Sequence, residues 1–351
     1  MKRKKVHPYV PELLNQFEKG RLTRREFLRF SGLLGVSAGA ASSLVGFSKP
    51  KSLFAAKIRR GGVLKVAVPI QKLTHPAQIS WMMLSNQVRH VLEYLTYTDH
   101  NNITHPYLLK NWEVSDDLKT WTLNLRQGIT FHNGDEFTAD DVVFTMTDFL
   151  RKEVGSSMLG YMNYLNPSNI EKTGKYQVIL HLTRPEIAVP EHLFHYPAAI
   201  LNHKTFEGDF LKNPHGTGPY TLEEFQTGER CVIKRRSDYW RKGADGLPLP
   251  YMDGMEFIDM GSEMSPQIAA IKSGTIDMID LAATGGINVY HALKDDPNVN
   301  VQAVVTGGTR VLRMRVDLKP WNDNRVRMAL KLCQHREKIL ALAYSGQGAI
   351  G

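Results

Sequence analysis

Cysteine is scarce in this chain: only Cys231 and Cys333 occur among its 351 residues. Zinc knuckles and iron–sulfur sites need clustered thiolates, so two cysteines this far apart exclude both kinds of centre. A disulfide between the two remains open on sequence grounds. Because free cysteine behaves as a small apolar residue, we favour two separate buried thiols.

The sequence also has few features of a metalloenzyme. It contains 13 histidines but no His-Glu-x-x-His motif, and no nucleophile, base and orienting group can be assigned. His192 and His195 would resemble paired metal ligands only on a helix, and Pro190 and Pro197 on either side disfavour one. We therefore expect no catalytic residues, no metal site and no cofactor.

Strongly uneven charge is absent from most of the chain. The formal net charge is +9, but residues 1–56 hold eleven Lys/Arg and three Asp/Glu, which leaves 9 − 8 = +1 for the rest. No stripe of basic and aromatic residues follows, so we expect no nucleic-acid partner. Apolar residues make up 42% and charged residues 23%, which are ordinary globular proportions. A chain of this length is expected to contain at least two lobes.

The first 56 residues carry the features of an export leader. Arg24 and Arg25 lie in the sequence TRREFLR at 23–29, and an uncharged stretch rich in Gly and Ala covers 30–48. This resembles a twin-arginine signal, in which a receptor reads the paired arginines. The alternatives are a basic amphipathic segment and an N-terminal anchor. We expect the twin-arginine translocase to export the protein to the periplasm, with cleavage near Ala56 or an uncleaved leader.

Strand-like and helix-like patterns alternate along the remaining chain, which predicts an α/β fold. Residues 63–68 and 120–131 are typical of strands, and the second alternates apolar with polar side chains. Thr138 and Asp141 predict a capped helix over 139–152. Further strands are expected at 178–182, 220–225, 230–236 and 276–279, and further helices at 265–273, 322–332 and 336–343.

Short segments follow one another in a recognisable order: GGVL at 61–64, EYL at 93–95, WEVSDD at 112–117 and LRQGITFHNGDEFTADDV at 125–142. They continue with GTGPY at 216–220, YW at 239–240, GTID at 274–277 and KPWNDNRVRMAL at 319–330. In this order they resemble family 5 of the extracytoplasmic solute-binding proteins, which includes dipeptide, oligopeptide and nickel-complex receptors. Turns and caps explain most of these residues, so the motifs identify the fold rather than the binding site.

The resemblance implies a periplasmic-binding-protein-like fold of type II, an α/β clamp of two lobes that closes on a ligand by hinge bending. By that pattern residues 57–305 form lobe I, a subdomain is inserted in it at about 91–195, and residues 306–351 begin lobe II. Family members usually continue for well over a hundred more residues. We therefore expect an incomplete second lobe, and poor ligand binding by the 351-residue chain.

The resemblance also implies a function. The chain would be the substrate-binding component of an ABC-type importer, which captures oligopeptides or dipeptides and delivers them to permease subunits in the inner membrane. Metal complexes such as those of nickel, then opines or oligosaccharides, rank behind peptides as ligands. Two other functions remain open: an exported metal-containing enzyme, and a binding module that serves sensing or chaperoning without a transporter. We expect no enzymatic activity.

Ligand contacts carry over from the family only by position, because relatives vary them to select their ligands. For Tyr94, Met158 and Tyr161 the competing explanation is core packing. For Arg310 and Arg313 it is a solvated strand face or an ion pair between the lobes. If either arginine faces the cleft, its planar guanidinium suits a carboxylate-bearing solute. The expected ligand-binding residues are Ser85, Asn86, Glu93, Tyr94, Thr96, Met158, Tyr161, Asp280, Ala282, Thr284, Arg310 and Arg313.

Overall fold

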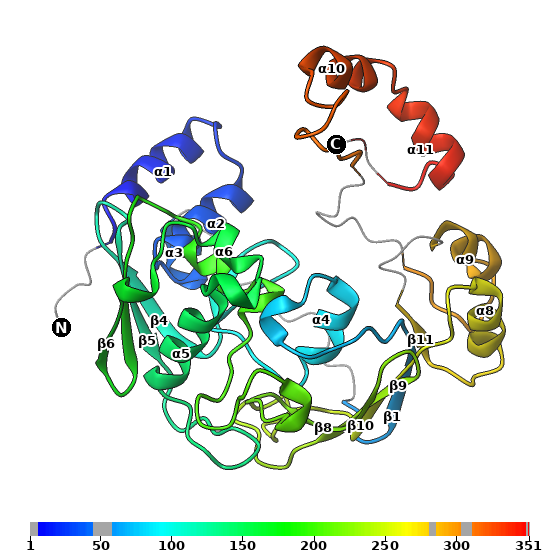
Figure 1. Ribbon diagram of the computed structural model, residues 1–351, viewed down its shortest axis with the longest axis horizontal. Helices are drawn as coiled ribbons and strands as arrows, with labels where there is room; N and C mark the ends of the chain where they lie inside the picture. Colours follow the sequence, from blue (N-terminus) through cyan, green and yellow to red (C-terminus); the bar gives the residue numbers. More distant parts are fainter. Residues whose placement is uncertain (1–5, 45–57, 281–285, 303–310, 349, 351) are drawn as a thin grey trace. The chain divides into compact units, whose positions relative to one another are not determined.

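The chain divides by its internal contacts into two units, Met1–Gly261 (unit 1) and Ser262–Gly351 (unit 2). Both units mix helices with strands (Figure 1), which confirms the predicted α/β class. In the described ranges no helix is both long enough and apolar enough to cross a membrane. The computed structural model describes residues 6–44, 58–280, 286–302, 311–348 and 350.

One sheet of unit 1 places four strands side by side in the order β1 (Val63–Ala67), β10 (Gly254–Ile258), β9 (Arg230–Arg235) and β8 (Tyr220–Gln226). β1 and β10 run parallel, whereas β10 with β9 and β9 with β8 are antiparallel. Gly228, between β8 and β9, has a φ of +76°, which glycine tolerates because it has no Cβ. The strands predicted at 63–68, 220–225 and 230–236 are therefore confirmed.

The other large sheet of unit 1 is antiparallel, with the strand order β4 (Leu109–Val114), β5 (Thr120–Leu125), β7 (Gln177–His181) and β6 (Ile170–Gly174). The predicted alternation on β5 is confirmed, because Trp121, Leu123 and Leu125 are each at most 3% exposed. Helix α5 (Ala139–Phe149) contacts β6 and β7. The strand is shorter than predicted, because the chain leaves the sheet after Leu125.

Short elements connect these two sheets, and several of them carry candidate site residues. The antiparallel pair β2 and β3 is one of them, and helix α4 precedes it. The connecting elements are η1 (Pro76–Gln78), α4 (Met82–Val88), β2 (Thr96–Thr98), β3 (Thr104–Pro106), η2 (Lys152–Val154), α6 (Met158–Tyr161), η3 (Pro167–Asn169), α7 (Val189–His192), η4 (Tyr196–Ala198) and η5 (Phe210–Lys212).

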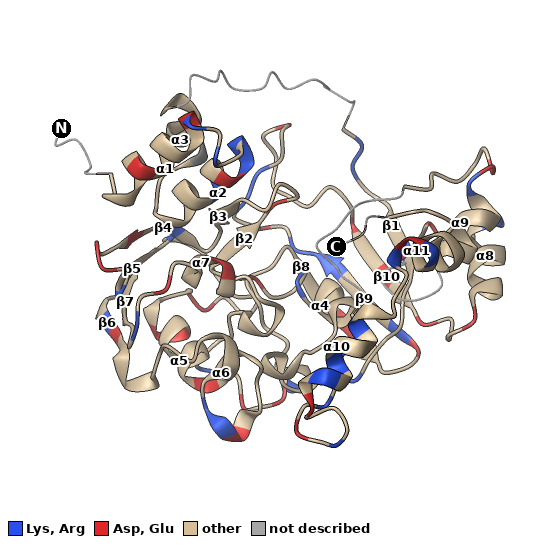
Figure 2. Cartoon of the chain, turned by 90° about the horizontal axis from the view of Figure 1, so that it is seen from above, with Lys and Arg blue, Asp and Glu red and all other residues tan. Residues whose placement is uncertain are grey.

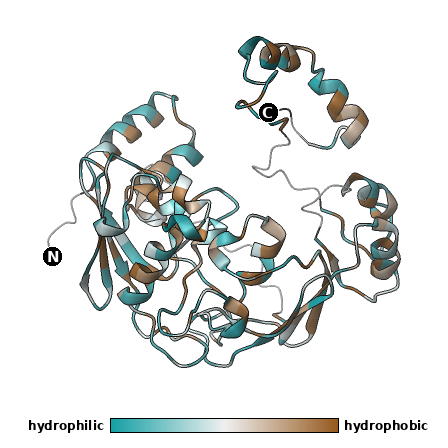
Figure 3. Ribbon diagram, viewed as in Figure 1, coloured by the Kyte–Doolittle hydropathy of each residue, from teal (hydrophilic) through white to brown (hydrophobic). Residues whose placement is uncertain are grey.

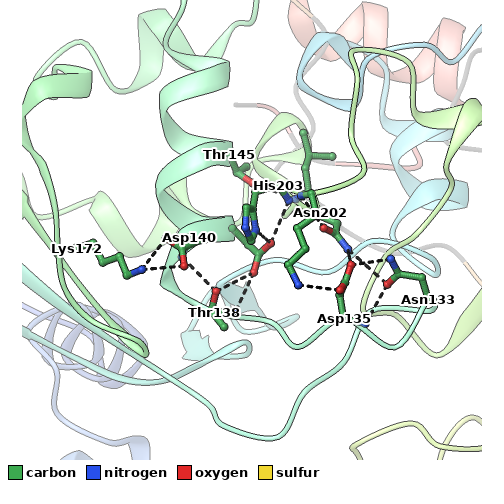
Figure 4. A network of polar contacts seen from close by, with 11 residues as sticks. Asn133, Asp135, Thr138, Asp140, Thr145, Lys172, Asn202 and His203 are labelled. Carbon is green, nitrogen blue, oxygen red and sulfur yellow. Dashed lines mark hydrogen bonds and ion pairs between the residues drawn. The ribbon is translucent and has the colours of Figure 1, made fainter.

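The first turn of α5 anchors the chain that follows η4. Thr138 caps α5 and forms a capping box with Asp141, as the sequence predicts. The buried Asp141 carboxylate also contacts His203 (Figure 4). Its Oδ1 accepts a hydrogen bond of 3.1 Å from the His203 backbone N–H and lies 2.7 Å from His203 Nδ1. Beside it, Asp135 accepts a hydrogen bond of 3.0 Å from Asn202 Nδ2. One helix end therefore holds the segment just beyond η4 in place.

The first prediction concerns this anchor. We expect Asp141→Ala to lower the free energy of unfolding by about 3 kcal/mol, because it removes the buried acceptor of both the cap and His203. Asp140→Ala is the matched control, since Asp140 forms a half-exposed ion pair with Lys172 at 2.7 Å, and such pairs contribute about 0–1 kcal/mol. Urea denaturation of both variants measures the difference. Equal losses would contradict the anchoring role.

Unit 2 is mainly helical in its described part, which contains α8 (Met264–Lys272), β11 (Met278–Ile279), α9 (Gly286–Leu293), α10 (Asn324–Leu332) and α11 (Arg336–Tyr344). The three predicted helices of this region are confirmed as α8, α10 and α11. Asp323 caps α10 by accepting a hydrogen bond of 2.8 Å from the Arg325 backbone N–H. Leu332 and Leu342 are each 76% exposed, and Figure 3 shows apolar residues on both α10 and α11.

Residues 6–44 are folded and belong to unit 1. They form α1 (Tyr9–Glu18), α2 (Arg24–Leu33) and α3 (Ala38–Leu44). Gly35, with a φ of +81°, separates α2 from α3, so the apolar stretch makes two short helices rather than one long one. The sequence predicted a leader here, but it contained no sign that this leader packs against the rest of the chain.

One local prediction needs correction, and another is confirmed. Cys231 and Cys333 are both free, which confirms separate thiols, but Cys231 is buried whereas Cys333 is exposed. Pro190 occupies the first turn of α7, where its missing N–H would have no helical partner, but α7 ends at His192, so His195 lies outside the helix as predicted. Among the residues that the structure describes, no group of three or more His, Cys, Asp and Glu side chains could hold a metal ion.

The predicted lobe boundaries stay predictions. The contacts divide the chain between Gly261 and Ser262, whereas the family pattern places the passage to lobe II near residue 305. Residues 303–310 lie outside the described residues. The sheet formed by β4–β7 lies within the predicted insert at 91–195, and the strands β1, β8, β9 and β10 lie outside it.

Candidate functional site

The segment that leads into β2 sends alternate side chains in opposite directions. Glu93 and Tyr94 are adjacent, and both are buried. Glu93 contacts residues that follow β9, whereas Tyr94 contacts the segment around η4. The Glu93 backbone carbonyl accepts a hydrogen bond of 2.9 Å from the Ile200 N–H. This segment therefore connects three parts of unit 1.

Glu93 lies in a closed acid–aromatic cluster. Tyr239 Oη donates a hydrogen bond to its Oε1, and Trp240 Nε1 donates one of 3.1 Å to its Oε2. Tyr107 Oη lies 3.0 Å from Tyr239 Oη, and the Arg241 guanidinium lies 5.0 Å from the centre of the Tyr107 ring. Burial raises the pKa of Glu93, and the hydrogen bonds from Tyr239 and Trp240 oppose that rise. The carboxylate is thus occupied by partners within the protein.

Tyr94 connects α4 with η4. Its hydroxyl donates a hydrogen bond of 3.1 Å to the Tyr196 carbonyl, and its ring meets that of Phe194 edge-on at 5.4 Å. Ser85 Oγ, on α4, lies 3.5 Å from the same hydroxyl. Arg89 donates a hydrogen bond of 3.1 Å to Ser85 Oγ, and its guanidinium lies 5.7 Å from the Phe194 ring centre. The structure therefore brings the predicted residues Ser85 and Tyr94 together beneath the surface.

Thr96 and Met158 are also buried. Thr96 Oγ1 donates a hydrogen bond of 2.7 Å to the Pro190 carbonyl, which ties β2 to α7. Met158 begins α6 and belongs to the apolar core of unit 1, as the packing alternative proposed. Asn86 is half-buried on α4. Buried side chains of this kind support a binding surface, and their direct contact with a ligand stays a prediction.

Tyr161 is the most exposed of the predicted residues in unit 1, at 47%. Its ring lies 4.2 Å from that of His195 and 5.9 Å from that of His192, and the His195 ring lies 4.3 Å from that of Tyr196. We call these four residues the His–Tyr surface. It combines residues of α6, α7 and η4, which lie up to 35 residues apart in the sequence.

The imidazoles of this surface are uncharged near neutral pH. Burial, followed by the proximity of His192, lowers the pKa of His195 to about 4. Burial also lowers the pKa of His192, whose Nδ1 lies 2.9 Å from Tyr164 Oη. Within the described chain His195 Nδ1 is buried and has no hydrogen-bond partner. The surface therefore offers aromatic faces and neutral polar groups rather than a charge.

The remaining predicted residues belong to unit 2. Asp280 is half-buried and Arg313 is exposed. Ala282, Thr284 and Arg310 lie outside the described residues. Their contacts with a ligand stay predictions.

Sequence reasoning missed several of these features. Arg89 and Tyr196 were not singled out, and His192 and His195 were considered only as metal ligands. The signal that could have found them is the aromatic run at 194–196, which directly follows a short helix. Nothing in the local sequence shows that α6 lies against this run, because that contact depends on the tertiary fold.

One motif was also overlooked in the leader. Residues 35–39 read GVSAG, which fits the Gly-x-Ser-x-Gly pattern of hydrolases. That pattern requires a strand before the serine, whereas here helix α2 precedes it. Ser37 Oγ instead accepts a hydrogen bond of 3.3 Å from the Ala40 N–H at the start of α3. The serine therefore serves as a helix cap and not as a nucleophile.

Comparison with known proteins identifies the family. A model of the bacterial extracellular solute-binding proteins, family 5 Middle, matches residues 104–351, which is well over half of the chain. The chain belongs to this family. Family 5 proteins bind solutes for transport and are not enzymes, which agrees with the expected absence of catalytic residues at the level of the family.

Individual members of family 5 resemble the chain over most of its length. The di/tripeptide-binding protein 1 of Pseudomonas aeruginosa is 28% identical over 268 residues, which cover 70% of this chain and 48% of that protein. The chain spans about half the length of this relative. It spans 46% of the SapA protein of Escherichia coli and 61% of that of Salmonella typhimurium.

Solved structures of family 5 show the same fold. The periplasmic binding protein DppA of Helicobacter pylori, in complex with the peptide STSA, has a TM-score of 0.68 and 21% identity, and covers 83% of this chain and 60% of its own. NikZ of Campylobacter jejuni, in complex with Ni(L-His), has a TM-score of 0.67 and 23% identity, with 81% and 55% covered. This confirms the predicted periplasmic-binding-protein-like α/β fold.

The second prediction concerns the buried acid. Burial makes the pKa of Glu93 higher in the folded state than its value near 4.5 in the unfolded chain. Protonated Glu93 therefore stabilises the fold at a pH below the unfolded pKa. This stabilisation is lost as the pH rises through the folded pKa. The free energy of unfolding of the wild type, relative to Glu93→Gln, should therefore fall as the pH increases from 4 to 7, by about 1.4 kcal/mol for each unit of pKa elevation. Urea denaturation at several pH values measures it.

Glu136→Gln is the control for this experiment, with the opposite sign. Glu136 also accepts a hydrogen bond from a tyrosine, Tyr176, but it is exposed and paired with Lys175, whose hydrogen bond lowers its pKa. Glu136 therefore adds to the free energy of unfolding at a pH above its unfolded pKa, and this contribution is lost as the pH falls through the folded pKa. Slopes of the same sign for the two glutamates would contradict the assignment of Glu93 as a desolvated acid.

Proposed function

We propose that this chain is the extracytoplasmic solute-binding component of an ABC-type importer, which takes up short peptides and delivers them to permease subunits in the inner membrane. The observation that carries the proposal is the family 5 match over residues 104–351. Two lines of support accompany it. The relatives include a di/tripeptide-binding protein, and a structure with the same fold contains a bound peptide.

The chemistry of the His–Tyr surface suits a peptide. Peptide groups are planar, uncharged and polar on both edges, so they stack on aromatic rings and exchange hydrogen bonds with neutral imidazole and phenol groups. Tyr161 and His195 offer both kinds of contact at its exposed edge. Arg89, close to Phe194, supplies a guanidinium that would pair with a terminal carboxylate.

We divide the predicted residues by role. Tyr161 and Asn86, which reach the surface, are proposed to contact the ligand. Ser85, Glu93, Tyr94, Thr96 and Met158, which are buried, are proposed to hold the contacting residues in position. In unit 2, Asp280 and Arg313 remain proposed ligand contacts, as do Ala282, Thr284 and Arg310.

The third prediction tests the ligand and the surface together. Mass spectrometry of the full-length protein that carries this chain, purified under native conditions, should detect a copurifying peptide, and isothermal titration of the same protein should give the affinity of matching di-, tri- and tetrapeptides. Tyr161→Ala should weaken binding about tenfold, because it removes an aromatic face from the ligand. Its fold should persist, since Tyr161 is 47% exposed.

Tyr9→Ala is the matched control for ligand binding. Tyr9 is 54% exposed and its ring stacks on that of His7 at 5.4 Å, so it resembles Tyr161 in its surroundings but lies on α1. Its affinity should equal that of the wild type. A metal complex, an opine or a sugar in the mass spectrum, with no peptide bound in titration, would contradict the peptide proposal.

We also propose that the protein reaches the periplasm by the twin-arginine route, with Arg24 and Arg25 as the residues read by the translocase. The support is the TRREFLR sequence at 23–29, followed by an uncharged stretch. Periplasmic relatives of the same family make that destination the expected one.

The fourth prediction tests this route. Changing both arginines, Arg24→Lys with Arg25→Lys, keeps the charge but removes the planar guanidinium groups. The doubly substituted protein should remain in the cytoplasm, where cell fractionation followed by immunoblotting would detect it, while Lys19→Arg should be exported normally. Unchanged export of the double variant would rule out the twin-arginine route.

A further inference from the structure

The N-terminal segment 6–44 is bound to the folded body by a specific interface. Helix α2 contacts β3 and α7, and α1 and α3 contact α2. Figure 2 shows α2, with its basic residues, beside β3 and near α7. The body side of this interface consists of residues around 100–115 and 191, which come together only after β2, β3, β4 and α7 have folded.

Apolar contacts form the centre of the interface. Phe27 of α2 is fully buried, Leu33 is 2% exposed, and the Phe17 ring lies 5.6 Å from that of Phe27. A Cβ at Gly35 would lie 3.1 Å from the Trp112 carbonyl oxygen, so the backbones approach closely at this glycine. Trp112 Nε1 also donates a hydrogen bond of 3.0 Å to the Leu33 carbonyl. Such complementarity is typical of a specific contact.

Polar contacts surround this centre. Arg29 donates two hydrogen bonds to Glu191 of α7, from Nε at 2.8 Å and from Nη2 at 3.1 Å, in the parallel geometry that suits a guanidinium and a carboxylate. Arg25 Nε donates one of 2.7 Å to the Asn101 carbonyl. Thr23 and Glu26 form a capping box that starts α2 at the motif itself.

The motif and the interface therefore use the same residues. The sequence TRREFLR at 23–29 supplies Arg25 and Arg29 to the contact with the body, and its Phe27 is fully buried. A receptor that reads the paired arginines needs the Arg25 side chain, and in the docked segment the Nε of Arg25 is already bonded to the Asn101 carbonyl. Docking and recognition cannot occur at the same time on one molecule.

We propose that segment 6–44 is a reversible cap on the folded protein, and that its docking competes with recognition of the leader by the export machinery. The competition rests on the proposed twin-arginine route, but the docking itself does not. Folding of the region around β3, β4 and α7 builds the docking surface. The fraction of molecules with an accessible leader is then set by the strength of the interface.

Substitutions on the body side test this proposal, because they leave the leader sequence intact. Glu191→Arg places a like charge opposite Arg29, and hydrogen–deuterium exchange of the full chain reports docking through the amides of 24–33. We expect exchange there to become about tenfold faster. The charge-reversed pair, Arg29→Glu with Glu191→Arg, should restore the wild-type rate. Glu171→Arg is the control, since Glu171 forms an exposed ion pair with His181 on β6 and β7.

Export provides the second measurement. Glu191→Arg should raise the rate at which newly made protein appears in the periplasm, in a pulse-chase experiment, while Glu171→Arg should not. Unchanged exchange at 24–33 in Glu191→Arg, or failure of the charge-reversed pair to restore it, would overturn the docking. Faster exchange without faster export would overturn the competition. If Arg24→Lys with Arg25→Lys is exported normally, the route is wrong, and the exchange data still decide the docking.

Discussion

The buried carboxylate of Glu93 is the interaction on which the rest of unit 1 depends. A buried carboxylate costs free energy unless hydrogen bonds replace its water, and Tyr239 and Trp240 supply those bonds here. The segment leading into β2 is thereby held against the chain that follows β9. Because neighbouring side chains on an extended segment face opposite ways, Tyr94 is directed to the other side and holds η4 through the Tyr196 carbonyl.

Two anchors thus define where the His–Tyr surface lies. Tyr94 holds the start of η4 from one side. Thr145 and Asp141 of α5, with Asp135 just before the helix, hold residues 201–203 beyond η4. The aromatic side chains that reach the surface are therefore presented by a well-supported loop. This division between buried supports and exposed contacts is how a family can keep one scaffold and change its ligand.

Local signals in the sequence were reliable where the physics is local. The capping box of Thr138 and Asp141 and the alternation along β5 were predicted from neighbouring residues, and both are present. The prediction that no helix carries both His192 and His195 is confirmed, since α7 ends at His192, although Pro190 lies in the first turn of that helix. The candidate site residues were chosen by position along the chain, which carries no information about burial.

The α/β class and the order of most elements follow from the sequence alone, because caps, turns and periodicity depend on residues a few positions apart. The family was inferred from the resemblance of an ordered set of short segments, which also needs no tertiary contact. The fold, by contrast, fixes which of the candidate side chains are buried and which are exposed. Glu93 meets Tyr239 and Trp240 across nearly 150 residues, Tyr161 meets His195, and Arg29 pairs with Glu191. Such contacts exist only once the chain has folded, since each depends on the placement of several elements at once.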